Sequence, residues 1–349
     1  MSKVFVSLTF DYEIFFSENF FNYDNVLFNP SDQILELSKL ENIPFVWFID
    51  ILSYVRHSQL SDLKSINYCK KFSNQIKKMN SLNQDIQLHI HPHWIKGTYD
   101  HFKMTWDIPP HCWSLGDILE KDGYKKTEEI IDSSIKTLTD LAENPPVSFR
   151  AGGYCIQKNE RVIMKLLESK GIKIDSSVLP NCYLKSSYHN YNYLNTPPYS
   201  HWPISSETGV GVFNKSGNLI EAPVTTIKKN KILKDIFIKK IKEKIYHSKK
   251  PRKGRGILSF KEKSINRGVR LSFDHSSDIN LDFLLKIFNR LLSLYKNEYV
   301  SWINILSHPK SMDDESIDVL KKFIYIVKTK YKNVRFCTHA DVSNGILQE

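Results

Sequence analysis

The sequence has no long apolar run, few cysteines and no paired-cysteine motif. No stretch approaches the roughly 20 uncharged residues that a membrane-spanning helix needs. The apolar run after Lys3 is closed by Asp11, so it is too short for the core of a signal peptide. The five cysteines are scattered and none lies in a CxxC pair, which argues against a disulfide framework. We therefore expect reduced thiols in a soluble, cytoplasmic protein.

The chain has 349 residues, and 41% of them are hydrophobic. This composition excludes disorder of the whole chain and supports one large domain or two small ones. We predict a single domain over residues 1–349, with an irregular and basic insertion at about 180–280.

The net charge of +11 is concentrated in one segment. Residues 227–270 contain 17 basic and 3 acidic side chains, whereas the remainder has 32 basic and 35 acidic ones. Three interpretations are open: a solvated insertion with a basic loop, an amphipathic helix on an anionic membrane surface, or nucleic-acid binding. The third is the least favoured, because no recognised nucleic-acid-binding module accompanies the charge. The second would place the protein at the inner face of the membrane.

Apolar runs alternate with helical patterns along most of the chain. The predicted strands are residues 3–11, 43–49, 86–90, 147–151, 172–178, 300–306 and 334–338. The predicted helices are residues 30–40, 61–79, 126–142, 159–170, 281–296 and 314–331. This alternation indicates an α/β fold with a parallel sheet, open or closed into a barrel, and active sites of such folds gather at the carboxyl ends of the strands.

Two motifs at predicted strand ends carry metal-binding residue types. Thr9-Phe10-Asp11-Tyr12-Glu13 places two carboxylates after the first strand, and His89-Ile90-His91-Pro92-His93 places three histidines after the third. Imidazole with carboxylate is a donor set that suits zinc. His89 and His93 can converge through the turn at Pro92, whereas His91 points the other way if the segment stays extended. Taken singly, the motifs are equally consistent with a turn cap and a surface histidine tract.

Three further motifs end later strands. Arg150-Ala151-Gly152-Gly153-Tyr154 combines an arginine with glycines that allow close approach of a ligand, Asp175 lies in an Asp-Ser-Ser segment, and His308 follows Leu306-Ser307. Each also has an ordinary role in a turn or cap. Their joint placement at successive strand ends favours one catalytic site. Ser272-Phe273-Asp274 echoes Thr9-Phe10-Asp11, but we attribute this short match to chance.

The ordered motifs TFDYE, HIHPH, RAGGY, IDSS and LSHP resemble the polysaccharide deacetylases of carbohydrate esterase family four, which share the NodB homology domain. The resemblance is strongest to the intracellular branch associated with surface-polysaccharide biosynthesis. It spans about residues 4–308, with about 180–281 outside it. It implies a distorted (β/α) barrel that uses one divalent metal ion, usually zinc, to remove an acetyl group from a sugar.

The resemblance also implies roles for single residues. Asp11 is similar to the catalytic base and Arg150 to the arginine that orients it. Glu13, His89 and His93 take the places of the metal ligands. In the remaining motifs, the backbone N–H of Tyr154 would help to hold the oxyanion, and His308 would be the general acid. Asp175 would support either that acid or the network around the base.

The first motif departs from the family pattern, which has two adjacent aspartates, because Tyr12 separates Asp11 from Glu13. If Glu13 points away, Asp11 becomes the metal ligand instead. The fourth-motif tryptophan is also missing beside Asp175. We predict a metal-dependent sugar deacetylase that acts on a nucleotide-linked, lipid-linked or polymeric acetamido sugar. The alternatives are a deformylase or other amide hydrolase, and a catalytically silent protein that binds carbohydrate or membrane.

Overall fold

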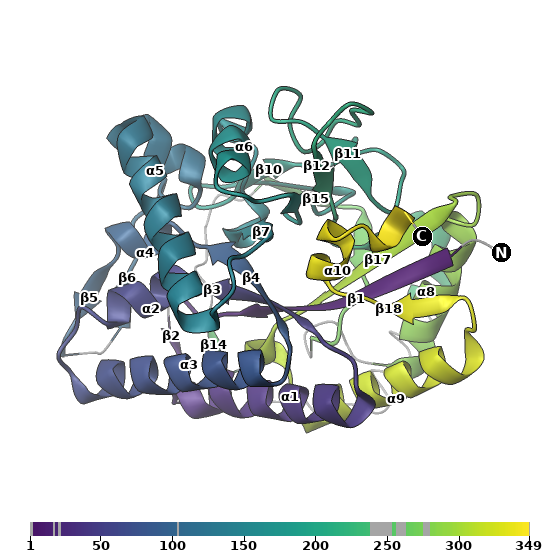
Figure 1. Ribbon diagram of the computed structural model, residues 1–349, viewed down its shortest axis with the longest axis horizontal. Helices are drawn as coiled ribbons and strands as arrows, with labels where there is room; N and C mark the ends of the chain where they lie inside the picture. Colours follow the sequence, from purple (N-terminus) through teal and green to yellow (C-terminus); the bar gives the residue numbers. More distant parts are fainter. Residues whose placement is uncertain are drawn as a thin grey trace.

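The computed structural model describes residues 3–16, 18–19, 22–102, 105–237, 253–255, 263–274 and 280–348. Its centre is a mixed sheet with the strand order β11-β12-β8-β7-β4-β3-β1-β17, and β18 also pairs with β1. The strands are β1 (Lys3–Tyr12), β3 (Val46–Asp50), β4 (Asp85–Ile90), β7 (Ser148–Ala151), β8 (Ile174–Asp175), β11 (Trp202–Ile204), β12 (Leu219–Glu221), β17 (Val300–Ser307) and β18 (Val334–Phe336). Figure 1 shows this sheet surrounded by helices.

The sheet is strongly curled. A parallel bridge between Val224, just after β12, and Asn304 in β17 brings its two ends together. Thr225 reinforces the contact, because its N–H donates to the Asn304 carbonyl and its Oγ1 accepts from the Asn304 N–H at 2.9 Å. The predicted α/β class and distorted barrel are therefore confirmed. β11 runs antiparallel to β12, which makes the sheet mixed.

Helices form an outer layer around the sheet. They are α1 (Asn29–Glu41), α2 (Ile51–His57), α3 (Leu63–Ser81), α4 (His93–Lys96), α5 (Leu115–Ala142), α6 (Glu160–Ser169), α8 (Leu281–Leu294), α9 (Asp314–Lys330) and α10 (His339–Ser343). α6 packs on α5, α5 on α3, α1 on α9, and α9 on α8. With one face of the sheet covered by helices and the other filled by the barrel interior, β3, β4 and β17 are buried at every position.

The remaining described strands form small sheets outside the main sheet. They are β2 (Glu18–Asn19), β5 (Thr98–Asp100), β6 (Thr105–Asp107), β9 (Cys182–Lys185), β10 (Asn190–Asn192), β13 (Thr226–Lys228), β14 (Gly254–Arg255), β15 (Lys263–Asn266) and β16 (Gly268–Arg270). The single turns are η1 (Asp24–Phe28), η2 (Gly152–Tyr154), η3 (Lys229–Lys231), η5 (Pro309–Ser311) and η6 (Ile346–Gln348). Two strands of the predicted insertion, β11 and β12, belong to the main sheet, because β12 pairs with β8.

The basic segment 227–270 is described only in part, since residues 238–252 and 256–262 lie outside the described residues. The amphipathic pattern predicted there stays a prediction. Among the described helices, none is long and apolar enough to cross a membrane.

Gln87 joins two neighbouring strands at the amino end of the barrel. Its Oε1 accepts the N–H groups of Val147 and Ser148 at 2.9 and 2.7 Å, and the side chain is 2% exposed. Gln87→Met leaves both backbone donors buried without a partner, at about 1–3 kcal/mol each. We expect the free energy of unfolding in urea to fall by about 2–4 kcal/mol. The exposed control Gln59→Met should change it by less than about 0.5 kcal/mol, and equal effects of the two substitutions would contradict this role.

Candidate active site

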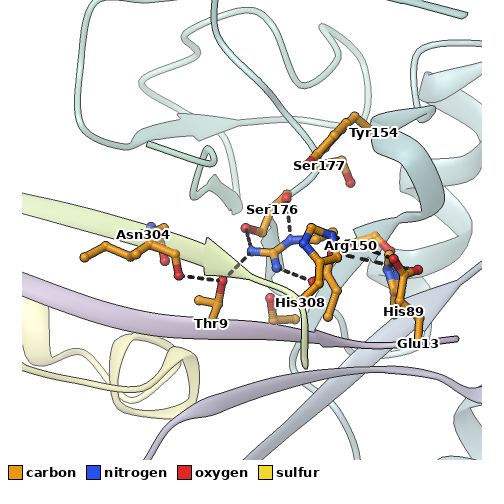
Figure 2. A network of polar contacts seen from close by, with 12 residues as sticks. Thr9, Glu13, His89, Arg150, Tyr154, Ser176, Ser177, Asn304 and His308 are labelled. Carbon is orange, nitrogen blue, oxygen red and sulfur yellow. Dashed lines mark hydrogen bonds and ion pairs between the residues drawn. The ribbon is translucent and has the colours of Figure 1, made fainter. Parts of the chain in front are cut away.

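Arg150 lies at the centre of the polar network at the carboxyl ends of the strands (Figure 2). Its side chain is fully buried at the end of β7. Nη1 donates to Asp11 Oδ1 at 2.5 Å, and Nη2 donates to Thr9 Oγ1 and Ser176 Oγ at 3.1 and 2.8 Å. Nε donates to the Ser176 carbonyl at 3.0 Å, and the guanidinium stacks on Phe48 at 3.9 Å. A buried charge that is bonded on so many sides holds Asp11 in one orientation.

The second oxygen of Asp11 faces the site. Oδ2 lies 3.6 Å from His308 Nε2 and 3.9 Å from His89 Nε2. One carboxylate oxygen is therefore fixed by Arg150 while the other is directed at the two imidazoles. Asp11 thus has the placement that a general base needs, since such a group must reach the reacting proton directly or through one water.

Glu13, His89 and His91 form a buried group that could hold a metal ion, with their ligand atoms within 4.8 Å of one another. Glu13 Oε2 lies 2.6 Å from His91 Nε2 and 3.4 Å from His89 Nε2. His89 Nδ1 donates to the Arg150 carbonyl at 2.8 Å, which leaves Nε2 as the ligand atom. Among the described residues, His91 Nδ1 has no hydrogen-bond partner, and the buried contact between Glu13 Oε2 and His91 Nε2 does not have the geometry of a hydrogen bond. These orphaned atoms and the mixed nitrogen and oxygen donor set fit a zinc-like ion.

The electrostatics of this group follow from burial and one nearby cation. Burial alone would raise the pKa of Glu13, but Lys310 and His91 hold that pKa well below its usual range. Burial lowers the pKa of His91 to about 4, so its imidazole is neutral at pH 7. For His89, burial acts to lower the pKa, but Asp11 and Glu13 outweigh it and raise the pKa above its ordinary value. Metal binding at His89 would release a proton and weaken in acid.

His93 lies beside this group rather than in it, and His91 takes the place that the sequence analysis gave to His93. His89 and His91 are two residues apart, so extended backbone puts them on the same face, and the expectation that His91 points the other way was wrong. Pro92 already has helical backbone angles, so the strand alternation stops before His93. His93 begins α4, and its ring stacks on Trp113 with the centroids 4.2 Å apart. Burial lowers the pKa of His93 well below its usual range.

His308 is paired with Asp274. The Asp274 carboxylate accepts the His308 backbone N–H at 2.7 Å and lies 2.9 Å from its Nδ1. Burial acts to raise the pKa of Asp274, but His308 and Arg270 hold it below its usual value, so the carboxylate is ionised. His308 Nε2 then points toward Asp11 and Glu13. Asp274 belongs to the Ser-Phe-Asp echo that the sequence analysis attributed to chance.

The sequence leaves two places for Asp175, beside His308 or in the network around the base, and Asp175 lies on the base side. Its carboxylate accepts the N–H and the hydroxyl of Ser177 at 3.1 and 2.8 Å, and it stands opposite Glu221 across β8 and β12. Ser177 Oγ in turn accepts the Ala151 N–H at 2.8 Å. Asp175 therefore supports the segment that carries Arg150, and Asp274 is the acid beside His308.

Tyr154 links this segment to the insertion. Its backbone φ is +64°, its hydroxyl accepts from Arg270 Nη1 at 2.8 Å, and its carbonyl accepts from the Tyr193 hydroxyl. Burial raises the pKa of Tyr154 to about 12. Arg270 Nη2 also lies 3.7 Å from Asp274 Oδ2. Arg270 thus connects Tyr154 with the carboxylate that supports His308, and no spacing in the sequence singles it out.

Three buried carboxyl groups near the site have no cation in contact among the described residues, and their pKa values are raised rather than lowered. Burial raises the pKa of Asp50, at the end of β3, to about 7, and its Oδ2 accepts from Trp94 Nε1 at 2.7 Å. Burial also raises the pKa values of Asp175 and Glu221. An adjacent cation is therefore what separates Glu13 and Asp274, whose pKa values are lowered, from these carboxyl groups, whose pKa values burial raises.

Comparisons with known proteins identify a shared fold. No family model matches the chain, and no curated protein matches its sequence. A Mycobacterium smegmatis protein assigned as a polysaccharide deacetylase superposes with a TM-score of 0.51 at 14% identity, over 98% of this chain and 90% of that chain. PuuE allantoinase and a Pseudomonas aeruginosa PAO1 protein assigned as a polysaccharide deacetylase both have TM-scores of 0.48, at 14% and 13% identity, with the same coverage. The fold of this chain is thus similar to that of a polysaccharide deacetylase.

Proposed function

We propose that this protein is a metal-dependent hydrolase that removes the N-acetyl group from an acetamido sugar in glycan or surface-polysaccharide synthesis. The observation that carries the proposal is that a candidate base, a candidate general acid and a candidate metal-binding group lie next to one another. His308 Nε2 lies 3.6 Å from Asp11 Oδ2 and 3.7 Å from Glu13 Oε1, and Glu13 also belongs to the group with His89 and His91. The shared fold with a polysaccharide deacetylase supports an acetylated carbohydrate as the substrate class.

Hydrolysis of an acetamide needs an activated water, stabilisation of the oxyanion and a proton for the departing amine. A divalent ion such as zinc, held by Glu13, His89 and His91, would activate water and polarise the carbonyl group. Asp11 accepts the proton of the attacking water, and Arg150 holds its carboxylate in one orientation. His308 donates a proton from Nε2 to the amine while Asp274 holds Nδ1. The backbone N–H of Tyr154 contributes to oxyanion stabilisation.

For the carrier of the sugar we propose only a class of compounds. Nucleotide-linked, lipid-linked and polymeric acetamido sugars all present the same amide. A cytoplasmic location with transient attachment of residues 227–270 to anionic lipid would suit a lipid-linked substrate. Nucleic acid is not proposed as a partner.

The direct test is a panel of acetamido sugars incubated with the zinc-loaded protein and read by mass spectrometry. We expect equal amounts of acetate and free amine from at least one substrate class. Formyl and cyclic-amide compounds belong in the same panel, and turnover of these alone would assign a different amide hydrolase. Sugar binding without turnover of any compound would support the catalytically silent alternative.

The assignment of Glu13, His89 and His91 as metal ligands can be tested without measuring turnover. His89→Ala removes an imidazole whose Nε2 faces Glu13 and whose Nδ1 is already fixed by the Arg150 carbonyl. We expect the wild type to bind about one zinc ion per chain and the variant to bind it at least about tenfold more weakly. Elemental analysis after dialysis measures both. The control His201→Ala removes a histidine outside the group and should keep full occupancy, and full occupancy in His89→Ala would refute the ligand assignment.

Asp11→Asn tests the base. Asparagine keeps the size of the side chain but cannot take a proton from water, so kcat should fall by about 10²–10⁴-fold. Sugar affinity should be retained, as measured by calorimetry on the same variant. Unchanged kcat would show that another group acts as the base.

Asp274→Asn tests the general acid through pH. The substitution removes the negatively charged partner of His308 Nδ1, which lies 2.9 Å away. We expect kcat to fall by about 10²-fold and the alkaline limb of the pH–rate profile to move to lower pH. Asp235→Asn removes a carboxylate that pairs with Lys286 and Arg290 elsewhere, and it should leave the profile in place. A uniform loss of rate at every pH would assign Asp274 a purely structural role.

A further inference from the structure

Lys310 is a buried lysine at the metal group that the proposed mechanism does not use. It lies in η5, two residues after His308, and is 9% exposed. Its Nζ lies 2.8 Å from Glu13 Oε1 and donates to the Ile14 carbonyl at 3.2 Å. The rings of Phe16 and Phe15 lie 4.4 and 5.1 Å from the ammonium. A buried ammonium needs such partners, because an unpaired one is strongly unfavourable.

The two oxygens of Glu13 have different partners. Oε2 faces the imidazoles of His91 and His89, at 2.6 and 3.4 Å. Oε1 faces Lys310 at 2.8 Å. Lys310 therefore contacts Glu13 Oε1, whereas the other oxygen, Oε2, contacts His89 and His91.

The ionised groups around the site are matched one to one. Asp11 contacts Arg150 at 2.5 Å, Glu13 contacts Lys310 at 2.8 Å, and Asp274 contacts Arg270 at 3.7 Å. With neutral imidazoles, these six side chains sum to zero charge. A divalent cation would therefore enter a site whose carboxylates already have cationic partners, and Lys310 is the partner nearest its own ligands.

We infer that Lys310 controls how the proposed site binds its metal. By holding Oε1, it restricts Glu13 to one ligand oxygen, Oε2, and its charge weakens the affinity for a divalent ion. One-oxygen coordination leaves a position open for water, as catalytic zinc sites require. The inference rests on the proposed metal group and adds a residue to it. The competing possibility is that Lys310 only neutralises Glu13 in the empty site and is displaced when metal binds.

Zinc affinity tests the inference directly. Competition with a chromophoric chelator would compare the wild type with Lys310→Met and with Lys158→Met, which removes a lysine paired to Asp117 and Glu120 away from the site. We expect Lys310→Met to bind zinc at least about tenfold more tightly, equivalent to about 1.4 kcal/mol, and Lys158→Met to match the wild type. Equal or weaker binding by Lys310→Met would overturn the inference.

Glu13→Gln separates this inference from the proposed function. If Glu13→Gln binds zinc as the wild type does, the proposed metal group is wrong whatever Lys310 does. If Glu13→Gln loses zinc while Lys310→Met leaves the affinity unchanged, the metal group stands and only the role of Lys310 fails.

A crystal structure of the zinc-loaded wild type gives a second test that needs no lysine variant to fold. We expect zinc on Glu13 Oε2 and Lys310 Nζ still within hydrogen-bond distance of Oε1. Zinc bound to both Glu13 oxygens, with Lys310 displaced, would overturn the inference.

Discussion

The buried ion pair between Arg150 and Asp11 is the interaction on which the rest of the site depends. Arg150 has no exposed surface, so its charge is tolerated only because Asp11, Thr9 and Ser176 surround it. Thr9 and Asp11 lie near the carboxyl end of β1, Ser176 directly follows β8, and Arg150 is the next-to-last residue of β7. Removing one partner of a buried pair typically destabilises a protein by about 3–5 kcal/mol. The pair therefore ties three strand ends together and directs one Asp11 oxygen at the catalytic centre.

The same rule governs the other two carboxylates at the site. Glu13 is ionised beside Lys310, and Asp274 is ionised beside His308 and Arg270. Asp50, which no cation contacts, has a pKa raised to about 7. The distribution of cations thus decides whether a buried carboxyl group at the site has a lowered or a raised pKa. It also separates the roles of the three carboxylates, because each has its own cationic partner, Arg150, Lys310 or Arg270, and can serve as base, metal ligand or support of the acid.

The barrel could be predicted from the sequence because its strands are short apolar runs between amphipathic helices. The strand ends also placed Asp11, Glu13, His89, Arg150 and His308 at one edge, where the structure brings them together. The choice between His91 and His93 depended on the period of two in a strand, which puts His89 and His91 on the same face, whereas the helical turn at Pro92 takes His93 off that face. Asp274 and Arg270 escaped prediction because long-range folding, not local spacing, brings them to the site, and only the echo of Thr9-Phe10-Asp11 in Ser272-Phe273-Asp274 carried a signal. Lys310 follows the predicted His308 by two residues, but its pairing with Glu13 depends on the fold.

The most direct test of the account is a crystal structure of the Asp11→Asn variant with zinc and an acetamido sugar that the wild type hydrolyses. We expect zinc bound to Glu13, His89 and His91, with the carbonyl oxygen of the acetamide next to the zinc ion. The amide nitrogen should lie within hydrogen-bond distance of His308 Nε2. Zinc on other residues, or an acetamide bound away from this group, would contradict the central claim that the three paired carboxylates form one hydrolytic site.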